Sequence, residues 1–163
     1  MSTRYSRIAV LAVLGVAVAG GRLARGEEKT AASAHVMVSP GDLQWADAPP
    51  SLPAGAKLAV IEGDPSKAGL FTMRLKAPAN YRIPAHWHPA DEHVTVISGT
   101  FYMGMGDKLD VAEGKGLGAG SFAVMPARTQ HFAYTNGEAV IQLHGVGPWG
   151  INYVNAADDP RKK

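Results

Sequence analysis

The chain has 163 residues, enough for one domain with a hydrophobic core and too few for two ordinary domains once a leader is subtracted. Nineteen glycines, eleven prolines and a charged fraction of only 18% are typical of a turn-rich globular protein, and they argue against a disordered chain or a helical bundle. Because the chain has no cysteine, disulfides, thiolate ligands and a cysteine nucleophile are all excluded.

The formal net charge of +2 arises in the first 34 residues, which carry five basic and two acidic side chains. The remaining residues contain 11 basic and 12 acidic side chains, so their net charge is −1. A nearly neutral domain of this kind has no basic patch that would attract nucleic acid. We therefore expect no nucleic-acid partner.

The N-terminus has the pattern of a Sec-type export signal. Two arginines among the first seven residues form a short basic region, residues 8–19 form an apolar run, and an Ala-Val-Ala triplet at its end fits a signal-peptidase site. The run is shorter than the ~20 residues of a membrane-spanning helix, so a stable membrane anchor is the weaker interpretation. Cleavage after Ala19 and cleavage after Ala34 both stay open. We predict a signal peptide and flexible leader over residues 1–34, and a periplasmic or secreted mature protein.

From His35 onward the sequence is a series of short runs rich in Val, Ile, Phe, Tyr and Thr, separated by turn-forming residues. About seven to ten strands at this spacing indicate a sandwich or a barrel, so we predict one all-β domain over residues 35–163. Segments 49–55 and 114–120 are predicted to be an extended surface loop and a mobile loop. The predicted strands are 57–61, 70–77, 93–98, 100–105, 121–125, 131–135 and 139–146.

A set of potential metal ligands lies within this domain. His86 and His88 are separated by one residue, and side chains at i and i+2 leave the same face of a strand, so both imidazoles can point into one cavity. Glu92 begins the next strand and can face the same way, and His131 could supply a fourth ligand from a distant strand. Such a set suits one divalent transition metal ion, with Fe, Mn or Zn preferred over Ni or Cu, and suits Ca or Mg poorly.

The spacing of these residues resembles that of the cupin superfamily. Residues 86–92 followed by Gly99 match the first cupin motif, HxHx3Ex6G, in every spacing. Gly120, Pro126 and His131 match the glycine, proline and histidine of the second motif, Gx5PxGx2Hx3N. The resemblance extends over most of the predicted domain. It implies a double-stranded β-helix, which is a jelly-roll barrel, with the metal bound inside by His86, His88, Glu92 and His131.

Three positions depart from the cupin pattern. Asn80 stands where the first motif usually opens with glycine, and asparagine tolerates a positive φ better than most residues. Arg128 replaces the glycine of the second motif, and Thr135 replaces its asparagine. None of these changes removes a ligand, but they weaken the transfer of any one relative's activity.

Two residues are candidates for roles beside the metal. His144 could act as a general base or orient a ligand if its face of the strand 139–146 looks inward, and otherwise has a structural role. Arg128 could hold an anionic substrate at the pocket rim, or could be an ordinary exposed turn residue. Strand parity places His93 on the outside. Apolar candidates for the pocket wall are Met73, Leu75, Phe122, Val124 and Met125.

Four protein ligands leave two positions open on a six-coordinate ion, which is the physical basis for predicting a dioxygenase-like oxidoreductase acting on a small organic molecule. The alternative is a non-catalytic metal- or ligand-binding or sensing domain, because the sequence also resembles the cupin domain of ChrR-type anti-sigma factors. A sugar isomerase or epimerase lacks a visible phosphate or nucleotide site. Barrels of this superfamily often pair through sheet edges, so a homodimer is a further expectation.

Overall fold

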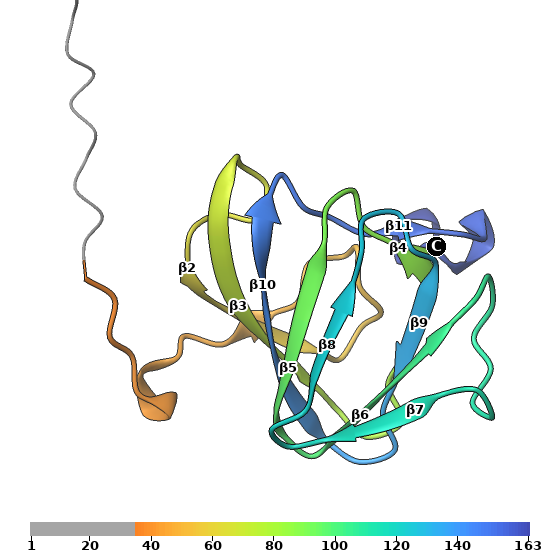
Figure 1. The fold of residues 1–163 in the computed structure, drawn as a ribbon, viewed down its shortest axis with the longest axis horizontal. Helices are drawn as coiled ribbons and strands as arrows, with labels where there is room; N and C mark the ends of the chain where they lie inside the picture. Colours follow the sequence, from red (N-terminus) through yellow and green to blue (C-terminus); the bar gives the residue numbers. More distant parts are fainter. Residues whose placement is uncertain (1–34) are drawn as a thin grey trace, which may run out of the picture. The chain divides into compact units, whose positions relative to one another are not determined.

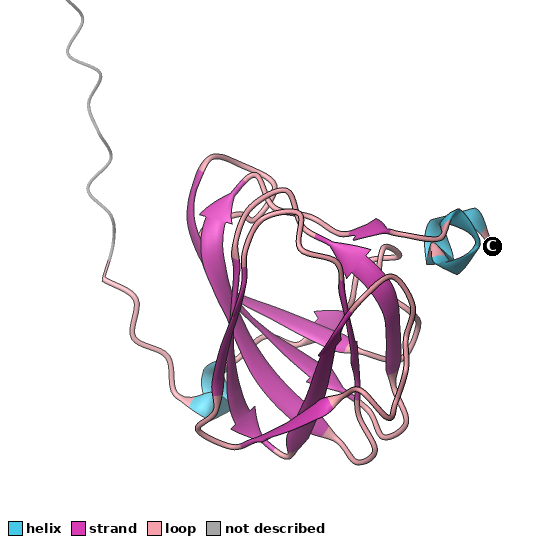
Figure 2. Ribbon diagram, turned by 45° about the vertical axis from the view of Figure 1, so that its right-hand side comes forward, coloured by secondary structure: helices cyan, strands magenta, loops and turns pink. Residues whose placement is uncertain are grey.

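The computed structural model describes residues 35–163, and the predicted signal peptide and leader, residues 1–34, lie outside this part. The described part is built from antiparallel strands with short 3-10 helices near its two ends (Figures 1 and 2). No helix within it is long and apolar enough to cross a membrane. The strands are β1 (Ala46–Asp47), β2 (Lys57–Glu62), β3 (Gly69–Ala77), β4 (Arg82–Trp87), β5 (Glu92–Ser98), β6 (Thr100–Met105), β7 (Lys115–Gly118), β8 (Phe122–Met125), β9 (His131–Tyr134), β10 (Ala139–Gly147) and β11 (Asn152–Tyr153). The 3-10 helices are η1 (Pro40–Asp42), η2 (Ala156–Asp158) and η3 (Pro160–Lys162).

The strands form two sheets that face each other, as Figures 1 and 2 show. One sheet has six strands in the order β1-β2-β3-β10-β5-β8, and the other has five in the order β11-β4-β9-β6-β7. The chain crosses repeatedly between the sheets, so the N-terminal strand β3 pairs along its whole length with the C-terminal strand β10. The prediction of an all-β domain is confirmed, and each of the seven predicted strands is present.

Alternation of side chains explains why the two sheets pack together. On β10, Ile141 and Leu143 are buried while the side chains between them are half-exposed. On β5, Val94 and Val96 are almost fully buried. Removing such side chains from water contributes about 1.5–3 kcal/mol each, so the inward rows of both sheets hold the barrel closed. The largest apolar side chains that are fully buried are Phe71, Phe132, Leu75, Val94 and Val96.

The segment 114–120 is not simply a mobile loop, because it contains strand β7 paired with β6. Two of its glycines, Gly114 and Gly116, lie against aromatic rings. A Cβ added at Gly114 would lie 2.4 Å from the ring of Tyr134, and one at Gly116 would lie 3.0 Å from Tyr102. These two tyrosines stack at 4.7 Å, so the glycine-rich edge strand covers an aromatic pair.

The segment 49–55 is a surface loop as predicted, and it is tied down at two points. The hydroxyl of Tyr81 donates a hydrogen bond to the carbonyl of Pro53, and the hydroxyl of Tyr153 donates to that of Ser51 at 2.9 Å. Burial raises the pKa of both tyrosines, which keeps the hydroxyls protonated as donors. The loop is therefore held in place at one end of the barrel.

Thr135 shows how the chain compensates for a departure from the cupin motif. Its side chain is fully buried, and its hydroxyl donates to the carbonyl of Pro78 at 2.6 Å while accepting from the backbone N–H of Tyr81 at 3.1 Å. Both partners flank Asn80, which has the positive φ of 60° expected at that turn. Thr135 thus fixes the turn that leads into β4.

Candidate metal centre

An irregularity in β4 aims His86, and His88 just after the strand, into the barrel. The pairing of β4 with β9 is regular at Ile83, shifts register, and resumes where His86 faces His131. Pro84 lies within the shifted stretch, where its missing N–H costs no ladder hydrogen bond. Beyond the irregularity His86 and His88 share the inner face, as the alternation of a strand requires.

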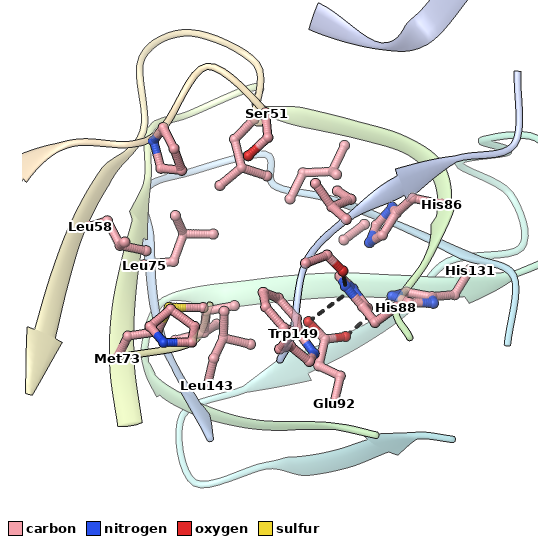
Figure 3. A pocket seen from close by; sticks show the side chains of 18 of the residues that line it. Ser51, Leu58, Met73, Leu75, His86, His88, Glu92, His131, Leu143 and Trp149 are labelled. Atoms are coloured by element: carbon pink, nitrogen blue, oxygen red, sulfur yellow. Dashed lines mark hydrogen bonds and ion pairs between the residues drawn. The ribbon is translucent and has the colours of Figure 1, made fainter. Parts of the chain in front are cut away.

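Four side chains meet at one end of the barrel interior (Figure 3). The three histidines His86, His88 and His131 bring one ring nitrogen each to within 4.8 Å of one another. Glu92 lies among them, with Oε2 3.2 Å from Nε2 of His131 and Oε1 3.5 Å from Nε2 of His88. None of the four residues is more than 6% exposed. The structure thus brings together all four residues that the sequence proposed as ligands.

Hydrogen bonds to the backbone fix the protonation of each imidazole. Every Nδ1 lies within 2.9 Å of a carbonyl oxygen, and a carbonyl can only accept, so Nδ1 carries the proton. In the neutral ring this leaves Nε2 as a bare lone pair directed into the cluster. The three carbonyls belong to Pro84 for His86, Gly150 for His88 and Thr129 for His131.

The inward atoms of the cluster are acceptors without donors. Nε2 of His88, Nε2 of His131 and Oε2 of Glu92 are all buried and lack a hydrogen-bond partner among the described residues. Each buried polar atom left in this state costs about 1–3 kcal/mol. Several such atoms facing one another repel, and a cation placed between them would satisfy them together.

The ionisation of the cluster also suits a metal ion. Burial lowers the pKa of His86 to about 3, helped by the neighbouring His131 and His88, and burial likewise lowers the pKa of His88. Neutral imidazoles and one carboxylate form the mixed nitrogen and oxygen set that Fe, Mn, Zn, Ni and Cu accept.

The cluster opens onto an apolar cavity of about 150 Å³. Figure 3 shows the histidines at one side of the cavity, with Leu58, Leu75 and Met73 at the other. Pro49, Ser51 and Leu52 of the anchored loop also line it. The wall has apolar side chains from both sheets, which include Met73, Ile83, Phe101, Met103, Ile141 and Leu143.

Trp149, which the sequence analysis missed, is part of this wall. Its ring stacks on His88 with centroids 4.1 Å apart and planes 13° apart. The connection from β10 to β11 places it there, and the next residue, Gly150, accepts the hydrogen bond from His88. The only signal in the sequence was an aromatic residue in a Gly-Pro-Trp-Gly turn, which gives no indication of a site.

His144 and Arg128 do not reach the cavity. His144 lies on the outer face of β10, where its ring stacks on His93 with the centroids 4.9 Å apart. A role as general base beside the metal required an inward-facing side chain, so His144 does not have that role. The guanidinium of Arg128 is exposed and lies 5.4 Å from the ring of Trp87. Its backbone has a φ of 64° and donates to the carbonyl of His88, which explains why the motif favours glycine there.

The remaining predicted wall residues divide between the two faces of the six-stranded sheet. Met73 and Leu75 line the cavity, as expected. Phe122 and Val124 are 55% and 40% exposed, and Met125 borders a separate groove with Met105. On the short strand β8 the alternation therefore turns Phe122 and Val124 outward, while Ala123 and Met125 are half-buried and pack against the core.

Comparison with known proteins gives a family and a fold. The profile of the ChrR cupin-like domain family matches residues 33–149. No curated protein sequence matches the chain.

Several solved structures have the same fold at low sequence identity. The polyketide cyclase RemF from Streptomyces resistomycificus superposes with a TM-score of 0.66 at 14% identity, covering 79% of this chain and 92% of RemF. A proposed acetylacetone dioxygenase from Methylibium petroleiphilum PM1 gives 0.60 at 17% identity, with coverage of 80% and 88%. KdgF from a Halomonas species gives 0.51 at 18% identity, with coverage of 71% and 96%.

Proposed function

For this chain, which belongs to the family of ChrR cupin-like domains, we propose the function of an exported metalloenzyme, a dioxygenase-like oxidoreductase acting on a small organic molecule. The observation that carries the proposal is the cluster of bare, buried acceptors at the end of an apolar cavity. A purely structural cluster would have its polar atoms paired within the protein, whereas this one is complete only with a cation and is open to a ligand on one side.

His86, His88, Glu92 and His131 are the proposed ligands of one divalent transition metal ion. When bound, the ion supplies Lewis acidity and, if it is iron or manganese, redox chemistry. The protein contributes the rest: carbonyl groups hold each imidazole in one tautomer, and the anchored loop 49–55 limits the access of water. The metal stays unassigned among Fe, Mn, Zn, Ni and Cu.

The cavity favours a small and largely apolar substrate. An apolar cavity of about this volume holds a molecule the size of benzene. No lysine or arginine among residues 35–163 lines it, so a phosphorylated sugar would find no counterion there other than the metal ion. The cyclase and the proposed dioxygenase that share the fold support an enzymatic role, although they resemble this chain in fold only.

Export is proposed from the leader alone. The basic residues, apolar run and small residues over positions 1–34 have the arrangement of a Sec signal, so the domain would work in the periplasm or outside the cell. A homodimer and a small-molecule ligand are the proposed partners, with no nucleic acid.

The test is to purify the mature protein from its native compartment, measure its metals by mass spectrometry, and follow oxygen uptake with a panel of phenols, thiols and keto acids. Iron or manganese together with substrate-dependent oxygen consumption supports the enzyme. Stoichiometric zinc without turnover contradicts it and supports the second candidate.

That second candidate is a non-catalytic metal- or ligand-binding or sensing domain. The family match favours it, because the same kind of cupin domain forms part of ChrR. The mostly apolar cavity is compatible with ligand binding without chemistry. A sensor would change its exposed surface or its oligomeric state on ligand binding, which scattering of the metal-loaded protein with and without the panel compounds would detect.

A further inference from the structure

The indole nitrogen of Trp149 is a buried donor without a partner. Within residues 35–163 no acceptor lies within hydrogen-bonding reach of its Nε1 atom, and the atom is shielded from solvent. The ring forms part of the cavity wall, beside His88 and Glu92 (Figure 3). Buried indole N–H groups usually find an acceptor, so a ligand in the cavity is the natural source of one.

The ring is held too firmly to turn its N–H toward water. The backbone N–H of Trp149 donates to the carbonyl of Pro65 at 2.6 Å. One face of the indole stacks on His88, and the ring of Phe71 lies 5.6 Å away. His88 is itself tied to the neighbouring Gly150, so the indole and this imidazole form one fixed unit.

The surroundings limit what the ligand can be. The cavity accommodates an apolar body of about benzene size, and within the described part of the chain no lysine or arginine lines it. An ammonium group has only donors, so it would repel the indole N–H, whereas a carbonyl or enol oxygen would accept a hydrogen bond from it. A small neutral oxygen compound therefore fits better than an amine or a phosphate.

We propose that the Trp149 Nε1–H donates a hydrogen bond to a carbonyl or enol oxygen of the bound molecule and so selects this class of ligand. The inference rests on the proposed function in that this molecule is the ligand of the same site. Trp149 is a binding residue in this account and takes no part in holding the metal.

The probes are cyclohexanone and its hydrocarbon isostere methylenecyclohexane, titrated into the metal-loaded full-length mature protein. The readout is the ¹H–¹⁵N signal of the Trp149 indole, which is identified by its loss in Trp149→Phe. Cyclohexanone should move this signal downfield, and methylenecyclohexane should not. In Trp149→Phe the affinity for cyclohexanone should fall about 3- to 10-fold, the loss of one neutral hydrogen bond, while the affinity for the hydrocarbon stays within about twofold.

Equal cyclohexanone affinity in the two proteins, or an indole signal that stays in place while cavity methyl signals shift, would overturn the proposal. The absence of cyclohexanone binding to the native protein would also overturn it.

Trp87→Phe is the matched control, since Trp87 packs with Arg128 away from the cavity. The chain has three tryptophans. If Trp149→Phe does not fold, the indole signals lost in Trp45→Phe and in Trp87→Phe are assigned first, and the remaining indole signal belongs to Trp149. Neither readout requires turnover, so a protein without oxygenase activity still gives a clear answer, and metal analysis reports separately on the proposed function.

Discussion

Oε2 of Glu92 on β5 lies 3.2 Å from Nε2 of His131 on β9, although the two strands belong to different sheets. Glu92 is the one member of the cluster from the six-stranded sheet, and the three histidines come from β4, the residue that follows it, and β9. An ion held by all four would link the two sheets across the barrel. Metal binding and the stability of the fold are therefore coupled.

Removal of the metal should lower the melting temperature. If the ion is present at about a thousand times its dissociation constant, binding contributes about 4 kcal/mol, which corresponds to a fall of about 10 °C or more for a domain of this size. Calorimetry before and after treatment with a chelator measures the change. Addition of the native metal should restore the original value, and an unchanged transition after verified metal loss would contradict the coupling.

Glu92→Gln should weaken metal binding and yet stabilise the metal-free protein. The amide keeps the shape of the side chain, and its one NH2 group can donate to the bare Nε2 of either His131 or His88, so the apo form should gain about 1 kcal/mol. Urea unfolding of the chelated proteins measures this gain, and competition with a metal indicator measures the affinity.

Glu138→Gln is the matched control for that experiment, because Glu138 is exposed in a turn. Glu138→Gln should change neither the stability of the metal-free protein nor its affinity for the metal. A metal-free Glu92→Gln protein that is less stable than the metal-free native protein would show that the acceptors of the cluster are already satisfied.

The prediction of the fold depended on alternation, which is a local property. Valine, isoleucine and leucine at every second position of β5 and β10 mark their buried faces, so the seven strands were visible in the sequence. Strand β7 was not, because its glycines have no side chains to alternate. Gly116 of β7 and Gly114 just before it lie against the rings of Tyr102 and Tyr134, contacts that form only in the folded barrel.

The sequence predicted the part of the candidate site that depends on the spacing of the motif residues and on which face of a strand each side chain takes. His86 and His88 share a face by their i, i+2 spacing, and the motifs placed Glu92 and His131 beside them, although metal ligation itself stays a prediction. Trp149 could not be found in this way, because a turn after β10 positions it. The outward face of His144 was in principle readable, since Ile141 and Leu143 compete for the interior from the opposite face of the strand.

Acid should destabilise the metal-free protein over a defined range of pH. His86 has a pKa of about 3 in the fold against 6.5 for an unperturbed histidine, so the unfolded chain binds a proton more readily. Its contribution to stability is present above pH 6.5 and is lost as the pH falls toward 3.

Urea midpoints of the chelated protein between pH 7.5 and 4.5, taken at constant ionic strength, measure this effect. They should decline steadily below about pH 6.5, and His86→Asn should show a shallower decline. A midpoint that is constant over the whole interval would contradict the account of buried, neutral histidines.

Arg128→Gly should leave metal content and turnover unchanged. The guanidinium contacts Trp87 outside the cavity, and glycine adopts the observed φ of 64° without strain. Loss of the cation–π contact, about 0.5–1 kcal/mol at an exposed site, opposes the relief of backbone strain, so the melting temperature should move by only a few degrees. A large rise in the Michaelis constant for an anionic substrate would instead place Arg128 at the site.

The most direct test of the central claim is the metal content of the purified protein and of His88→Ala, measured by mass spectrometry under identical conditions. The account predicts about one transition metal ion per native chain and near-complete loss in the variant, because His88 supplies one of the four inward ligands and Gly150 fixes its orientation. His93→Ala, which changes a histidine on the outer face, should retain the ion. Full metal occupancy in His88→Ala, or a folded native protein that binds no transition metal, would contradict the assignment.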